Sequence, residues 1–217
     1  MIVRQEYLNK LISLKDKRII KVVTGMRRSG KSTLFALYRD GLIRNGVSEP
    51  QIQFYNFEDA DNDDLQDYKV LHDHIKSRLV ADKTNYVFLD EIQNVPSFEK
   101  AVDSLFIKEN VDLYITGSNA YMLSGELATL LSGRYIEIQM QPLSLKEYAS
   151  AFPAMGESEL FRQYIANSSF PYTIELIDDP KNVRDYLDGI YNTVIVKDIS
   201  DRKKMTDTRQ LKRVFRF

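Results

Sequence analysis

The segment from Gly25 to Thr33 has the residue types and the spacing of a phosphate-binding loop. It reads GMRRSGKST and satisfies the pattern G-x-x-x-x-G-K-[ST]. Gly25 and Gly30 would let the backbone wrap around phosphate groups, so that N–H groups face the negative charge. Lys31 is expected to reach the β- and γ-phosphates, and the Ser32 hydroxyl to coordinate Mg²⁺. The chemistry that this segment predicts is binding of a nucleoside triphosphate with Mg²⁺.

The other residues of the loop are assigned to the same nucleotide site. These are Arg27, Arg28, Ser29 and Thr33. Arg27 and Arg28 lie in the variable part of the loop, where contact with phosphate, contact with a neighbouring subunit and simple exposure all stay open as interpretations.

Two adjacent carboxylates come directly after a short apolar run. The sequence YVFLDE places Asp90 and Glu91 at the end of a candidate strand, Tyr86–Leu89. Asp90 is expected to hold Mg²⁺, directly or through water. Glu91 is expected to polarise a water molecule for attack on the γ-phosphate. The pair favours hydrolysis over transfer to a small-molecule hydroxyl; the alternative is two solvent-facing acids at a strand end.

Three further polar residues are candidates for the catalytic site, each with a second interpretation. Ser118, with Asn119 beside it, is expected either to orient water and sense the γ-phosphate or to cap the following helix. Arg134 is expected to act as an arginine finger, in its own chain or across subunits, or to be a surface residue on a strand. Asn56 either hydrogen-bonds to Glu91 and holds it inactive or forms a turn.

The elements that must position these residues alternate between strand and helix. Apolar, β-branched runs predict strands over 19–23, 52–57, 86–89, 111–116 and 135–140, with helical periodicity between them. This alternation predicts an α/β fold with a parallel sheet covered on both faces. After Pro142 helices follow one another, the first opened by a capping box of Ser144 and Glu147.

Composition limits the remaining classes of protein. The 217 residues are 43% hydrophobic and 28% charged, with 30 basic residues, 31 acidic residues and no cysteine. Cysteine is absent, so disulfides and thiolate metal sites are excluded, as is usual in a reducing cytoplasm. No apolar segment approaches the ~18 residues of a membrane span. A cytoplasmic protein without a membrane partner is therefore expected.

Four segments, taken together, resemble a known family. GMRRSGKST, NFED, FLDEIQ and ITGSNAYMLSGELATLLSGRYIEIQMQPLSLKEY look like segments of the prokaryotic AAA-type ATPases, which are similar to archaeal ATPases of the STAND class. The resemblance covers residues 1–196. It implies a P-loop NTPase sheet in the order 5-1-4-3-2, a small helical lid, a winged helix and a nuclease-like C-terminal domain. It also implies a sensor role for Ser118 and matches Arg134 to the family's Gly-Arg.

The domain limits follow from these observations. Residues 1–142 are expected to form the nucleotide-binding domain and 143–196 the helical lid, with 197–217 as the truncated start of a winged helix. The lid has Ser168-Ser169-Phe170-Pro171 where the family often has Gly-Gly-Phe-Pro. The basic segment from Lys197 to the end suggests a nucleic-acid or protein partner, or only a solvated face.

The function that these patterns favour is Mg²⁺-dependent ATP binding and hydrolysis that drives or switches a partner interaction. A single chain and a homo-oligomer both stay open as the active form. One alternative is a nucleotide-gated switch with negligible turnover. A less favoured one is a small-molecule kinase.

Overall fold

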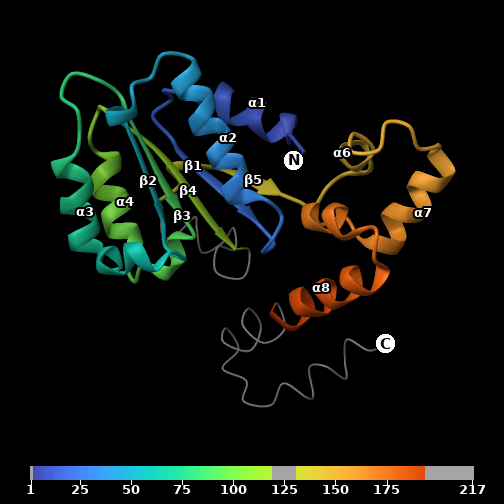
Figure 1. Ribbon diagram of the computed structural model, residues 1–217. Helices are drawn as coiled ribbons and strands as arrows, with labels where there is room; N and C mark the ends of the chain where they lie inside the picture. Colours follow the sequence, from blue (N-terminus) through green and yellow to red (C-terminus); the bar gives the residue numbers. More distant parts are fainter. Residues whose placement is uncertain (1, 119–130, 194–217) are drawn as a thin grey trace. The chain divides into compact units, whose positions relative to one another are not determined.

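A five-stranded parallel sheet forms the centre of the first of two compact units (Figure 1). The computed structural model describes residues 2–118 and 131–193. The sheet unit consists of residues 4–25 and 31–140. Its strands are β1 (Ile20–Gly25), β2 (Ile52–Asn56), β3 (Asn85–Asp90), β4 (Val111–Ser118) and β5 (Tyr135–Met140). The order β2-β3-β4-β1-β5 confirms the predicted order 5-1-4-3-2, read from the opposite edge.

Helices connect the strands and cover both faces of the sheet, which is why all strands are parallel. They are α1 (Gln5–Ser13), α2 (Lys31–Arg44), α3 (Tyr68–Ser77) and α4 (Phe98–Phe106), with short 3₁₀ turns η1 (Glu49–Gln51), η2 (Ala60–Leu65) and η3 (Ile92–Asn94). Figure 1 shows α1 and α2 on one side of the sheet and α3 and α4 on the other. The predicted α/β class is therefore confirmed.

The side chains of β3 explain why its sequence is an unbroken apolar run. Val87 and Leu89 pack in the core beneath α3 and α4, whereas Tyr86 and Phe88 pack in the core beneath α1 and α2. Successive residues of a strand point to opposite faces. Because both faces are buried, both sets must be apolar.

The second unit is helical. It contains residues 2–3, 26–30 and the described part of the chain after 140. Its elements are α6 (Leu145–Ala149), α7 (Glu157–Asn167), η4 (Pro171–Leu176) and α8 (Pro180–Thr193). Leu143, Tyr148 and Leu160 form its core. The capping box is present, since Ser144 accepts from the Glu147 N–H and the Glu147 carboxylate accepts from the Ser144 N–H.

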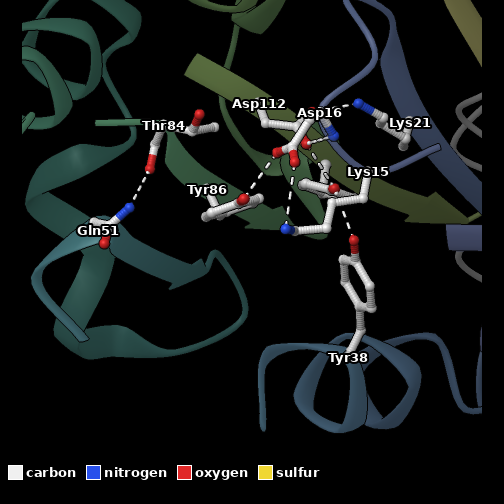
Figure 2. Close-up of polar contacts among 9 residues, drawn as sticks. Lys15, Asp16, Lys21, Tyr38, Gln51, Thr84, Tyr86 and Asp112 are labelled. Atoms are coloured by element: carbon white, nitrogen blue, oxygen red, sulfur yellow. Dashed lines mark hydrogen bonds and ion pairs between the residues drawn. The ribbon is translucent and has the colours of Figure 1, made fainter. Parts of the chain in front are cut away.

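A buried polar network lies where β1, β3 and β4 begin (Figure 2). Lys21 and Asp112, each the second residue of its strand, form an ion pair with almost no exposed surface. Asp112 Oδ2 also accepts from the Tyr114 hydroxyl at 2.8 Å and from the Asp16 N–H at 2.9 Å. Tyr38 of α2 contacts the Tyr114 hydroxyl at 3.0 Å. The Tyr86 hydroxyl of β3 donates to Asp16 Oδ1 at 2.8 Å, so the network joins three strand starts to α2 and to the loop before β1.

Burial dominates the electrostatics of this pair. It lowers the pKa of Lys21 and raises the pKa of Asp112, in each case against the attraction between the two charges. Nothing in the sequence analysis predicted the network. The available signal was a single charged residue at the second position of each of two apolar strands, a lysine in one and an aspartate in the other.

Candidate active site

The phosphate-loop segment joins β1 to α2, as its motif requires. β1 ends at Gly25 and α2 begins at Lys31. Within the loop, Arg28 (φ 67°) and Gly30 (φ 98°) have left-handed backbone conformations, and the Ser29 N–H donates to the Met26 carbonyl at 3.3 Å. Successive N–H groups in turns of this kind form concavities that bind anions. The N-terminus of α2 adds the positive end of a helix dipole.

The loop lysine and the second carboxylate of the acidic pair form a buried ion pair. Lys31 Nζ lies 3.1 Å from Glu91 Oε1 and also donates to the Gly25 carbonyl at 3.4 Å. Both side chains are more than nine-tenths buried. A buried ammonium held next to a phosphate loop is positioned to exchange its carboxylate partner for a phosphate oxygen.

Asp90 is wholly buried at the end of β3. Its Oδ1 accepts from the Thr116 hydroxyl, while its Oδ2 has no hydrogen-bond partner in the described part of the chain. Burial raises the pKa of Asp90, and hydrogen bonding to the Ser32 and Thr116 side chains opposes that rise. Asp90 and Ser32 are therefore brought together, as expected for residues that share a ligand.

These two side chains suit a hard cation. An unpartnered, buried carboxylate oxygen beside a hydroxyl is the donor set that Mg²⁺ uses when phosphates and water supply its other ligands. Within residues 2–118 and 131–193, no group of three or more His, Cys, Asp or Glu is arranged to hold a metal.

Two residues that the sequence analysis did not single out position the acidic pair. The Thr116 hydroxyl donates to Asp90 Oδ1 and accepts from the Glu91 N–H at 2.9 Å. Gln93 Nε2 donates to Glu91 Oε2 at 2.6 Å. Thr116 could have been found as a polar residue within the apolar fourth strand. Gln93 could have been found by its position two residues after Glu91.

Ser118 lies at the same edge of the sheet, beside the phosphate loop. It ends β4, pairs in register with Gly25 of β1, and is almost completely buried. Its hydroxyl has no hydrogen-bond partner among the described residues. This position suits a polar residue that contacts a bound ligand. Its neighbour Asn119 and the helix that Ser118 was expected to cap lie outside the described residues.

Asn56 ends β2 next to Asp90, but its side chain forms a turn. Its Oδ1 accepts from the Glu58 N–H at 2.9 Å, and its carbonyl accepts from the Asn62 amide at 2.9 Å. In the described structure Asn56 makes no hydrogen bond to Glu91. The geometry therefore follows the turn interpretation of the two that the sequence left open.

Arg134 lies at the opposite ends of the strands, away from the phosphate loop. It immediately precedes β5, and its carbonyl accepts from the N–H of Ile20, the first residue of β1. At about 3.3 Å per residue, the length of β1 separates its first residue from the phosphate loop by roughly 17 Å. Its guanidinium instead contacts Asp103 at 2.9 Å and lies over the ring of Phe106. The fold does not bring Arg134 to the site of its own chain.

The fold and the site together define a P-loop NTPase. A phosphate-loop sequence follows the central strand β1 of a parallel sheet, and Lys31 at its end pairs with Glu91, which follows β3, two strands away in the sheet. The family model described as "AAA domain" matches residues 17–149. The chain therefore belongs to the AAA domain family, which confirms the resemblance inferred from the motifs.

Two relatives match by sequence. An uncharacterized protein of Haemophilus influenzae is 40% identical and covers 100% of this chain and 55% of its own length. An uncharacterized protein of Methanocaldococcus jannaschii is 30% identical, covering 89% of this chain and 44% of its own length. The chain thus spans about half the length of the relatives that it matches.

Solved structures agree in fold. The Walker-type ATPase of Pyrococcus abyssi superposes with a TM-score of 0.60 at 15% identity, covering 95% of this chain and 77% of that one. AMPPCP-bound DnaA of Aquifex aeolicus superposes with a TM-score of 0.51 at 14% identity, covering 100% and 70%. None of the helices in the described ranges has the length and apolar character needed to cross a membrane.

Proposed function

We propose that this chain binds ATP with Mg²⁺ and hydrolyses it. The observation that carries the proposal is the convergence of Lys31, Asp90 and Glu91, all buried, where β1 and β3 end beside the phosphate loop. One residue has the charge to bind phosphate, one has an unpartnered oxygen for a cation, and one is a carboxylate able to accept a proton from water.

In this mechanism water attacks the γ-phosphate in line with the leaving ADP, and Glu91 orients the water and accepts its proton. Lys31 offsets the negative charge on the phosphate oxygens. Ser32 and Asp90 would hold Mg²⁺, which supplies further charge neutralisation when bound. Ser118, at the end of the neighbouring strand β4, would contact the γ-phosphate or the water.

A nucleotide-gated switch with slow turnover is the second candidate. The observation that favours it is the Lys31–Glu91 ion pair, because Glu91 in this arrangement is engaged by the loop and not by water. In that case the bound nucleotide would break the pair and change a partner surface, with hydrolysis too slow to matter. The two candidates differ in the effect of Glu91→Gln on turnover.

The partners follow as part of the proposal. ATP turnover would drive or switch an interaction in a homo-oligomer in which Arg134 serves the site of a neighbouring subunit. The basic segment 197–217, which lies outside the described residues, would contact nucleic acid or protein.

The deciding experiment is steady-state Mg-ATP hydrolysis by the protein over a range of protein concentrations, with Glu91→Gln as the blank and Lys31→Ala as a nucleotide-binding control. Turnover that disappears in both variants supports the ATPase. A very low rate that Glu91→Gln leaves unchanged, with nucleotide binding lost only in Lys31→Ala, supports the switch. Retention of binding and turnover in Lys31→Ala would overturn both.

A further inference from the structure

The carboxylate of Glu91 is held on both of its oxygens by side chains. Oε1 pairs with Lys31 Nζ at 3.1 Å, and Oε2 accepts from Gln93 Nε2 at 2.6 Å. The backbone N–H of Glu91 is bound in turn by the Thr116 hydroxyl at 2.9 Å. The residue is 6% exposed. Its orientation is therefore determined by these partners and hardly at all by bulk water.

The backbone after β3 explains how Gln93 reaches this carboxylate. Glu91 has a left-handed conformation, with φ 54°, and is followed directly by the 3₁₀ turn η3. A non-glycine residue keeps such a conformation only where its surroundings impose it. Here Ile92 and Val95 are completely buried on either side of Gln93. The Asn94 amide donates to the Phe57 carbonyl at 3.1 Å, which ties the turn to the end of β2.

The two partners of Glu91 differ in what a nucleotide does to them. Lys31 carries the charge that phosphate oxygens attract, so a bound triphosphate competes with Glu91 for it. Gln93 is neutral, and it belongs to the same turn as Glu91. A phosphate group gains little from drawing it away. Once Lys31 turns to phosphate, Gln93 is the side chain still bonded to the Glu91 carboxylate.

We infer that Gln93 is a positioning residue that holds Glu91 in the orientation needed to direct water at the γ-phosphate; this rests on the proposed ATPase function. Gln93 holds Oε2 and leaves Oε1, released by Lys31, to face the water. An ionised carboxylate only accepts hydrogen bonds, so the amide nitrogen of Gln93 must face it. Asn56 does not take this role in the described structure, because no hydrogen bond joins it to Glu91 and its amide oxygen accepts from the Glu58 N–H instead.

The test compares two substitutions of Gln93 in the full-length protein. Gln93→Met keeps a side chain of similar length but removes the N–H donor, whereas Gln93→Glu keeps the shape and sets a second negative charge against Glu91. Gln66→Ala is the matched control, since Gln66 donates to the carboxylate of Asp63 at 3.0 Å on the exposed surface. Single-turnover hydrolysis reports the chemical step, and calorimetry with AMPPCP reports affinity.

Both Gln93 substitutions are expected to lower the single-turnover rate at least about tenfold, because a misplaced catalytic group costs rate without costing ground-state binding. Affinity for AMPPCP should stay within about twofold in Gln93→Met, which adds no charge, and Gln66→Ala should match the wild type in both measurements. An unchanged rate in Gln93→Met would overturn the positioning role of Gln93 and leave the proposed ATPase function standing. Affinity or thermal stability that falls in step with the rate would show a merely structural role and overturn it too. No hydrolysis by the wild type would instead overturn the proposed function.

Discussion

At the scale of single residues, the chemistry depends on which groups exchange partners when a ligand arrives. Lys31 and Glu91 neutralise one another in their ion pair, which keeps two buried charges from being isolated. Asp90, in contrast, keeps one oxygen without a partner. A phosphate that binds Lys31 would therefore compete with Glu91, whereas the free oxygen of Asp90 can serve as a ligand for a cation.

Replacing Glu91 by Gln is expected to strengthen the binding of AMPPCP by about tenfold, or 1.4 kcal/mol. The substitution removes the carboxylate that competes with phosphate for Lys31 and leaves the lysine without its counter-charge in the free protein. Isothermal titration of both proteins in Mg²⁺ measures the difference. Weaker binding by the variant would show that the Lys31–Glu91 pair does not compete with the nucleotide.

Replacing Asp90 by Asn is expected to reduce nucleotide affinity about tenfold or more in Mg²⁺ and to change it little in EDTA. The amide supplies a weaker ligand to the cation, whereas contacts between loop and phosphate do not depend on it. Titrations with AMPPCP under both conditions separate these effects. An equal loss in EDTA would indicate that Asp90 supports the loop and does not hold the cation.

At the scale of elements, the two ends of the strands have different tasks. At their carboxyl ends, β3 ends with Asp90 and β4 ends with Ser118, while β1 leads through the phosphate loop to Lys31. At the opposite ends, the buried network of Lys21, Asp112 and Tyr114 joins β1 to β4 (Figure 2). Tyr86 of β3 is connected to this network through Asp16. Because this network also contacts α2 through Tyr38, it fixes the helix that begins with Lys31.

Breaking the ion pair of this network should destabilise the protein strongly. Lys21→Met leaves Asp112 charged and buried without its partner, and the expected loss is about 3–5 kcal/mol of unfolding free energy. The double variant Lys21→Met with Asp112→Asn should recover part of that loss, since neither charge remains. Urea unfolding of the wild type, both single variants and the double variant measures the coupling. Losses that simply add would argue against a coupled pair.

At the scale of the whole molecule, one candidate residue is separated from the site by the full length of a strand. Arg134 lies where β5 begins, whereas the phosphate loop follows the end of β1. A role for Arg134 in turnover therefore requires another copy of the chain. This requirement follows from the sheet unit by itself, because both ends of β1 belong to it.

Mixing two impaired variants tests this requirement. Lys31→Ala should lose nucleotide binding but retain Arg134, while Arg134→Ala should bind nucleotide but turn it over more slowly. If Arg134 acts across subunits, a mixture should recover part of the wild-type rate, because some interfaces combine an intact loop with an intact arginine. Activity of the mixture equal to the mean of the separate variants would count against the role. Turnover by Arg134→Ala at the wild-type rate would remove it.

Much of the site was predictable because its signals are local in the chain. The spacing of Gly25, Gly30 and Lys31 is set by the geometry of one loop, and Asp90 and Glu91 follow one apolar strand. Alternating strands and helices similarly follow from side-chain periodicity, which reports burial element by element. The order of the strands, in contrast, came from the resemblance to a family and not from periodicity.

What local patterns do not contain is the pairing of groups that lie on different elements. The contact of Lys21 with Asp112, the bond of Thr116 to Asp90 and the distance of Arg134 from the phosphate loop all depend on strand order and register. The choice of Asn56 for a turn and of Gln93 for Glu91 depends on how two loops fold against the sheet. Packing of the two cores determines these arrangements, because it acts between residues far apart in the chain, whereas motif and period are properties of neighbours.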